Sequence, residues 1–233
     1  MSVTTPFDRL TTSTDPAARS LERLSARFGV AFTVCQLGVM VLMATLVLPH
    51  GGSPSDPPLE RGAHVLDAAT AYRMGNYAFM VAGTLLLGFL GVVHQRLRRS
   101  DATGTLSTVA VASGSLLALV WPFAGVLHDV ALDAAAAGSD VRILAGWDSV
   151  APYALAFSVL PRLFFVGAVV LGLRRAGSSP WLQRTGLVLL PLSLVGSATV
   201  VVGELFPLLA LSTLGYEVWV GVLAWRWLRS TPR

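Results

Sequence analysis

Long apolar segments alternate with short polar ones along the whole chain. Six of these segments lie at residues 28–49, 73–94, 106–127, 150–173, 185–205 and 208–228. A helix needs about 20 apolar residues, at a rise of 1.5 Å each, to cross the apolar core of a bilayer. The pattern therefore predicts an all-α fold, a polytopic transmembrane helix bundle with six spans over residues 28–228.

The segment before the first span is polar. Residues 1–27 are rich in Ser, Thr, Arg and Asp and contain no apolar core of a signal peptide, so we expect the first span to be retained. Asp15 and Pro16 follow the order of an N-cap and a first helical residue. We expect a short interfacial helix here, with residues 229–233 as a polar tail at the other terminus.

Composition supports lipid as the solvent of this chain. Hydrophobic residues make up 54% of it and charged residues only 13%, whereas a soluble domain carries roughly 25% charged residues. So few charges cannot cover a water-soluble globule, and the expected partner is the lipid bilayer. The net charge of +4 does not indicate nucleic acid, because the basic residues form short clusters between apolar runs. The single cysteine excludes an intramolecular disulfide and a cysteine-based metal centre.

The arginines are divided unequally between the two predicted sides. Only Arg61, Arg73 and Arg142 fall on one side, Arg162 falls within a span, and the remaining thirteen fall on the other side. Cytoplasmic loops retain positive charge, so both termini are expected in the cytoplasm. The thirteen are Arg9, Arg19, Arg23, Arg27, Arg96, Arg98, Arg99, Arg174, Arg175, Arg184, Arg226, Arg229 and Arg233.

Two opposite charges fall deep within predicted spans. Arg162 lies about 18 Å from the outer end of the fourth span, and Glu217 lies about 14 Å from the outer end of the sixth. Either charge alone would cost roughly 2.5–3.5 kcal/mol or more at the centre of a bilayer. We therefore expect the two to pair or to face a water-filled cavity. The pair would serve as a binding or proton site, or it would fix the register of the two helices.

Three further polar residues could belong to the same site. Glu204 lies near the outer end of the fifth span, where its carboxylate would reach the interface or the mouth of the cavity. Arg73 and Asn76 lie near the outer end of the second span, at the same side of the bilayer. We expect a site that opens toward the outer face through these residues.

Histidine and aspartate on the outer side suggest a second kind of chemistry. His64 precedes Asp67 by three residues, and His128 directly precedes Asp129. Imidazole and carboxylate groups can hold Zn²⁺ with an open position for water, so these four residues are candidate metal ligands of a membrane enzyme. The spacing does not match that of known membrane hydrolases with seven helices, and interfacial histidines that respond to pH are the ordinary alternative.

Common catalytic and cofactor motifs are missing from the sequence. It contains no Gly-rich phosphate loop, no Walker motif, no nucleophile elbow and no HExxH. It also contains no lysine for a retinal Schiff base, and no cofactor is implied. These observations favour a role other than catalysis.

Three short stretches resemble a known family. They are AYRMG at 71–75, GSSPWL at 177–182 followed by Gly186, and LGYEVW at 214–219. Together with the order of helices over residues 25–229, they resemble the bacterial domain-of-unknown-function 4386 family. That family places Glu directly after Gly in its last span, whereas Tyr216 intervenes here. The resemblance implies a six-helix protein of the bacterial inner membrane and no established reaction.

Three functions are consistent with these observations. The leading one is the binding or transport of a small or amphipathic molecule at the Arg162 and Glu217 site. The first alternative is a metal-dependent membrane enzyme at the outer face. The second is a structural or accessory membrane subunit without a site, although nothing in the sequence indicates a protein partner.

Overall fold

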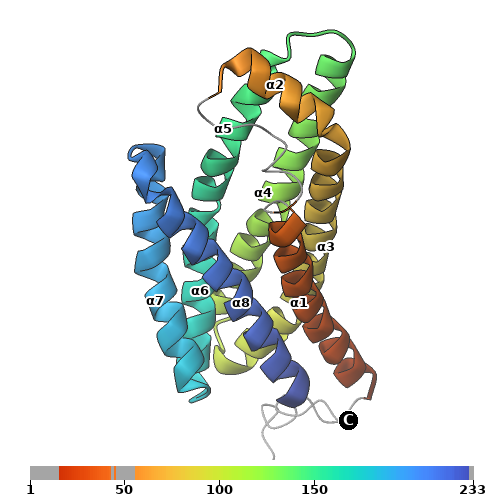
Figure 1. Cartoon of the computed structure of the whole chain (residues 1–233). Coiled ribbons are helices and arrows are strands. Elements are labelled where there is room, and N and C mark those ends of the chain that lie inside the picture. The colour runs from red at the N-terminus through yellow and green to blue at the C-terminus, as the bar shows by residue number, and fades with distance from the viewer. Residues whose placement is uncertain (1–15, 43–44, 46–55, 231–233) are drawn as a thin grey trace, which may run out of the picture.

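The computed structural model describes residues 16–42, 45 and 56–230, with the side chains of all of these except 147–152. The described residues form helices joined by short turns and contain no β-strand (Figure 1). The predicted all-α fold is thus confirmed. The α-helices are α1 (Pro16–Leu42), α2 (Pro58–Asp67), α3 (Ala69–Ser100), α4 (Thr105–Ala136), α5 (Arg142–Phe157), α6 (Val159–Arg175), α7 (Pro180–Ser197) and α8 (Phe206–Ser230), and the 3₁₀ turns are η3 (Ala198–Val200) and η4 (Gly203–Leu205).

Five helices within the described part of the chain are long and apolar enough to cross a membrane. Helix α7 is not among them, although it occupies most of the fifth predicted span at 185–205. It ends at Ser197, and the 3₁₀ turns η3 and η4 cover most of the residues up to 205. The five are Pro16–Leu42, Ala69–Ser100, Thr105–Ala136, Tyr153–Arg175 and Gly203–Ser230.

Several helix boundaries differ from those that the hydrophobic pattern predicts. Helix α1 runs without a break through the predicted interfacial helix and the first part of the first span. The predicted loops at 50–72 and 128–149 are largely helical where they are described, because α2 and the ends of α3, α4 and α5 fall there. Residues 1–15, 43–44, 46–55 and 231–233 of the predicted segments lie outside the described residues.

The fourth predicted span is formed by two helices, α5 and α6, that meet at Ser158. Proline has no N–H, so Pro161 cannot donate a hydrogen bond to the carbonyl of Phe157, and its ring crowds that carbonyl. Helix α5 ends at Phe157, four residues before the proline. The chain nevertheless keeps its direction, since the N–H of Arg162 donates to the carbonyl oxygen of Ser158 at 3.1 Å.

The helices pack in a closed order. Helix α1 contacts α3, α3 contacts α4, α4 contacts α6, α6 contacts α7, α7 contacts α8, and α8 contacts α1 again. The short helix α2 lies across one end of this arrangement (Figure 1). The other end holds the start of α1, the α3–α4 and α6–α7 turns, and the end of α8, so both described ends of the chain lie on one side.

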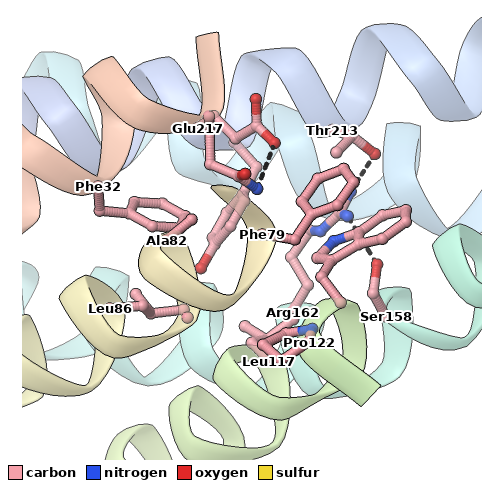
Figure 2. A pocket seen from close by; sticks show the side chains of 14 residues that line it. Phe32, Phe79, Ala82, Leu86, Leu117, Pro122, Ser158, Arg162, Thr213 and Glu217 are labelled. Carbon is pink, nitrogen blue, oxygen red and sulfur yellow. Dashed lines mark hydrogen bonds between the residues drawn. The ribbon is translucent and has the colours of Figure 1, made fainter. Parts of the chain in front are cut away.

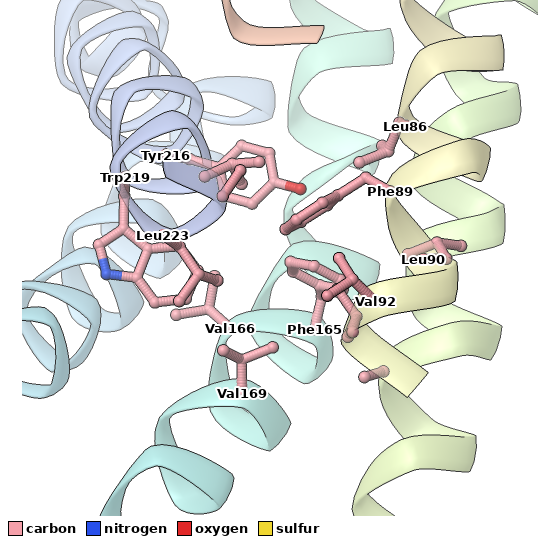
Figure 3. Packing of buried hydrophobic residues seen from close by; sticks show 14 of the residues in the cluster. Leu86, Phe89, Leu90, Val92, Phe165, Val166, Val169, Tyr216, Trp219 and Leu223 are labelled. Carbon is pink, nitrogen blue, oxygen red and sulfur yellow. The ribbon is translucent and has the colours of Figure 1, made fainter. Parts of the chain in front are cut away.

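The main core lies between these helices and is built from apolar side chains. Phe89 of α3, Phe165 of α6 and Leu223 of α8 are completely buried in it (Figure 3). Many equally apolar side chains point outward instead, and Phe123, Phe157 and Phe164 are each at least 64% exposed. An exposed apolar surface of this kind suits a lipid environment, in which it has no hydrophobic penalty.

Ion pairs connect the helices at the end opposite α2. The buried carboxylate of Glu22 on α1 forms an ion pair with Arg96, whose Nε lies 2.6 Å from it, and accepts a hydrogen bond from Arg99 Nη2 at 3.0 Å, both on α3. Asp101, between α3 and α4, accepts from the N–H of Leu106 at 2.9 Å and pairs with Arg175 at 2.9 Å. The Leu106 N–H, together with the Thr103 hydroxyl and Arg175, holds the pKa of the Asp101 carboxyl below its usual range. The ends of α1, α3 and α6 are thus linked by charge.

Small residues allow the close approach of α3 and α4. A Cβ atom placed on Gly83 of α3 would lie 2.7 Å from Cγ of Pro122 and closer still to the carbonyl oxygen of Ala118, both on α4. Backbone cannot yield as a flexible side chain can, so the two helices would have to separate.

We therefore expect Gly83→Ala to destabilise the fold by about 1–3 kcal/mol, as overpacking in other cores does. Gly38→Ala on α1 is the matched control, because nothing lies within 4 Å of its added methyl group, and we expect it to be neutral or slightly stabilising. Thermal unfolding of both variants in the same detergent would measure the difference. Equal melting temperatures would contradict the close α3–α4 contact.

Candidate functional site

Side chains from five helices line one small cavity in the interior (Figure 2). Its polar lining comes from α1, α6 and α8 and from Ser158 at the α5–α6 junction, and its apolar lining comes mainly from α3 and α4. The polar lining consists of Gln36, Ser158, Arg162, Thr213, Tyr216 and Glu217.

The guanidinium group of Arg162 is fixed from three directions. Its Nη1 donates to Thr213 Oγ1 at 2.9 Å, and its Nη2 donates to Ser158 Oγ at 2.8 Å. The carbon atom at its centre lies 5.1 Å from the centroid of the Tyr216 ring, within the range of a cation–π interaction. Arg162 is only 2% exposed, and all three of these partners are uncharged in their ordinary forms. Its positive charge is therefore buried among dipoles and an aromatic ring.

The carboxylate of Glu217 has a different partner. Its Oε1 accepts a hydrogen bond from Nε2 of Gln36 on α1 at 3.2 Å, and the residue is 1% exposed. The backbone carbonyl of Glu217 also accepts from the hydroxyl of Thr33 at 2.9 Å, so α1 and α8 are joined twice at this level. The acid is thereby held on the α1 side of the cavity.

Arg162 and Glu217 line the same cavity without forming an ion pair with each other. No salt bridge within 4.0 Å joins them among the ion pairs of the described residues. Arg162 Nε, Glu217 Oε2 and the Tyr216 hydroxyl are buried without a hydrogen-bond partner among the described residues. The structure thus brings the two predicted residues together, with hydrogen-bonding capacity left over on both.

The cavity has a volume of about 20 Å³, measured for the centre of a water molecule. A polar cavity holds a water from about 10–15 Å³ on this scale, so this one has room for about one. A single small polar species here could accept from Arg162 and donate to Glu217. Chemically, the arrangement can bind a polar group or relay a proton, since one side of the cavity donates hydrogen bonds and the other accepts them.

The other predicted members of this site do not line the cavity. Glu204 lies in η4 and is exposed. Arg73 forms an exposed ion pair with Asp133 of α4, and Asn76 donates to Asp129 Oδ1 at 2.8 Å. The predicted route to the outer face through Arg73 and Glu204 therefore has no counterpart among the residues that line the cavity.

The candidate metal ligands are not gathered in one group. His64 and Asp67 lie on α2, whereas His128 and Asp129 lie on α4. Among the described residues, no three histidine, cysteine, aspartate or glutamate side chains are arranged to hold a metal ion. Two of the four meet Asn76 instead, which lies 3.3 Å from His128 Nδ1 and also contacts Asp129. Among the described residues, these four side chains therefore do not form a group that could hold a metal ion.

Sequence reasoning missed four of the polar residues at the cavity. Ser158 precedes Arg162 by four residues, and Thr213 precedes Glu217 by four, so each pair shares one face of a helix. This spacing was a usable signal. Gln36 gave no such signal, because only the packing of α1 against α8 shows that it reaches Glu217. In the sequence, Tyr216 cannot be distinguished from a core aromatic residue, and only the structure shows that its ring lies beside Arg162.

In comparisons with protein-family models, with curated proteins and with solved structures, the chain has no match.

Loss of one charge at the cavity should be costlier than loss of both. We expect Arg162→Gln to destabilise the protein by roughly 1–3 kcal/mol, because it removes the charged donor to Ser158 and Thr213 and the positive charge that lines the cavity with Glu217. The double variant with Glu217→Gln should recover part of that loss, with a coupling energy of about 0.5–3 kcal/mol. Chemical unfolding of the two single variants and the double variant in one detergent would measure it.

Strictly additive effects would show that the two groups do not interact across the cavity. The matched control is Arg162→Gln combined with Ser113→Ala, because Ser113 is buried on α4 and does not line the cavity. We expect this second pair to be additive within about 0.5 kcal/mol.

Proposed function

We propose that the chain is a multi-pass protein of the bacterial inner membrane, with six spans and both termini in the cytoplasm. Five of the spans are supported by helices of sufficient length and apolarity. The sixth would be α7 with the turns that follow it, which closes the packing order between α6 and α8. The bacterial origin is supported by the resemblance of three short motifs to the domain-of-unknown-function 4386 family, to which we propose that the chain is related.

The proposed orientation is supported by where the arginines lie along the helices. Eleven described arginines belong to the end of the bundle that holds the α3–α4 and α6–α7 turns, and three belong to the end near α2. Cytoplasmic ends of membrane proteins carry such an excess. The eleven are Arg19, Arg23, Arg27, Arg96, Arg98, Arg99, Arg174, Arg175, Arg184, Arg226 and Arg229.

We further propose that the protein binds or transports a small molecule, and that the cavity between Arg162 and Glu217 holds the polar group of that molecule. The observation that carries this proposal is that both charged residues are almost fully buried, line one cavity and keep unpaired polar atoms there. Ionisable residues inside a membrane bundle usually mark the path of a substrate or ion. A purely structural pair would instead be expected to satisfy its own hydrogen bonds.

The size of the cavity limits the ligand. About 20 Å³ accepts a species similar in size to water, so a larger molecule requires movement of lining side chains. Phe79 and Trp121 line the cavity on the α3 and α4 side, and their rings stack with centroids 5.0 Å apart. These two aromatic side chains are the part of the lining that would have to move apart for a ligand to enter from that side.

Ligand binding should stabilise the wild-type protein and fail in variants of the cavity. The probes are formate, acetate, chloride, ammonium and methylamine, added to the purified protein in detergent during thermal unfolding. A ligand at 100 times its Kd should contribute about 2.7 kcal/mol. We expect at least one probe to raise the melting temperature of the wild type and of Ser113→Ala, and to have no effect on Arg162→Gln or Glu217→Gln. A response that both cavity variants retain would place binding elsewhere.

The topology can be tested on the full-length chain by cysteine labelling in intact cells. In a Cys35→Ser background, Ser139→Cys and Glu204→Cys should react with a membrane-impermeant maleimide added outside. Ala102→Cys and Ala176→Cys should react only after the membrane is permeabilised. All four positions are exposed and lie in turns or at helix ends. Protection of Glu204→Cys in intact cells would show that α7 does not cross the membrane, and labelling of Ala102→Cys would invert the orientation.

A further inference from the structure

A second, larger hollow lies on the side of the helix bundle, between α7 and α8. Its volume is about 630 Å³, within the range of about 300–1,000 Å³ that small-molecule sites occupy. It is distinct from the Arg162 cavity, because its lining residues on α8 are Leu211, Leu214, Gly215, Val218 and Trp219, whereas Thr213, Tyr216 and Glu217 of the same helix line the cavity. We call this hollow the α7–α8 groove.

The floor of the α7–α8 groove is apolar and open. Val188 on α7 is 63% exposed and Leu211 on α8 is 58% exposed. Gly215 adds no side chain at the middle of the α8 wall, and a Cβ atom there would lie 2.9 Å from Leu189. The groove therefore offers an apolar surface formed by both helices, with Leu189 packed closely against α8 at Gly215.

One end of the groove is charged. Trp181, Arg184 and Thr185 lie in the first two turns of α7, at the end of the bundle that is rich in arginine. Arg184 is exposed, and no described acidic residue forms an ion pair with it. Apart from Arg184, Thr185 and the tryptophans Trp181 and Trp219, the lining of the groove is aliphatic. The guanidinium group of Arg184 thus lies at one end of the otherwise mainly apolar α7–α8 groove.

We propose that the α7–α8 groove binds an anionic phospholipid, with an acyl chain along the apolar floor and the headgroup phosphate at Arg184. Basic groups at the cytoplasmic ends of membrane helices recognise such headgroups, and a tryptophan at this depth suits the interface. The inference rests on the proposed membrane placement and is independent of the Arg162 and Glu217 site.

Charge also argues against a second copy of the chain as the occupant. Two copies in one membrane share their orientation, so a twofold axis along the membrane normal would place both Arg184 side chains at the same depth in one interface. Their like charges would repel each other, whereas a phosphate group neutralises Arg184. The α7–α8 groove therefore fits an anionic lipid better than it fits a second copy of the chain.

Lipids with brominated acyl chains test this assignment, because bromine quenches the fluorescence of a tryptophan that it contacts. Trp181 lies in the groove and is 56% exposed. The full-length protein would be reconstituted into vesicles that contain brominated phosphatidylglycerol or brominated phosphatidylcholine at equal mole fraction. The Trp181 signal is obtained by subtracting the fluorescence of Trp181→Phe, since the chain has six tryptophans.

We expect phosphatidylglycerol to be preferred at Trp181 by about fivefold, which corresponds to about 1 kcal/mol for one arginine near a membrane surface. Arg184→Gln should reduce the preference to about one. Arg174→Gln is the matched control, because Arg174 is exposed at the same end and does not line the groove, and it should keep the preference. Val218→Phe, which fills the groove at an exposed position, should reduce quenching by both lipids.

Equal quenching by the two lipids in the wild type, or equal loss in Arg184→Gln and Arg174→Gln, would overturn the assignment. Chemical cross-linking to a dimer through the groove, abolished by Val218→Phe, would assign the groove to a second copy instead. Failure of the protein to enter vesicles at all would contradict the membrane placement, and so is distinguishable from failure of the lipid site.

Discussion

A guanidinium group and a carboxylate buried among apolar helices impose the strictest condition on this fold. Arg162 and Glu217 are almost inaccessible to solvent, and each unpaired charge at such a depth is expensive. The structure meets the condition by surrounding Arg162 with Ser158, Thr213 and the Tyr216 ring, and by giving Glu217 a hydrogen bond from Gln36. Helices α1, α6 and α8 must hold one register relative to each other for these contacts to exist.

The backbone features near the cavity follow from this condition. Pro161 interrupts the hydrogen bonding at the α5–α6 junction, and Ser158 lies at that junction with its hydroxyl toward Arg162. The hydroxyl of Ser158 also donates to the carbonyl oxygen of Leu155 at 2.6 Å, so it satisfies the local backbone and the arginine together. On the other side, the contact between Thr33 and the Glu217 carbonyl draws α1 onto α8. The α5–α6 junction and the close α1–α8 contact thus both position polar groups around the cavity.

The molecule has three distinct chemical regions at different depths. The end near α2 holds the Asn76, His128 and Asp129 contacts and the Arg73–Asp133 pair. The middle holds the small cavity, and the opposite end holds ion pairs of Glu22 and Asp101 that link α1, α3 and α6. In the ion pairs of Glu22 and Asp101 the carboxylates are buried and their arginine partners stay partly exposed, whereas Arg162 and Glu217 are both buried and rely on uncharged partners.

Apolar runs in the sequence alone determined the helical class and five of the membrane-capable helices, and they placed Arg162 and Glu217 within two of these helices. These features are local, because a hydrophobic run or a charge within it can be read without knowing its neighbours. Only the tertiary structure decided that Gln36 binds Glu217, that Arg162 turns to Thr213 and Ser158, and that His64 and His128 lie on helices that do not form one metal site. It also decided that α7 ends at Ser197. Those outcomes depend on which helices pack together and at what rotation, and a periodic apolar sequence on a helix that faces both lipid and protein leaves that rotation open.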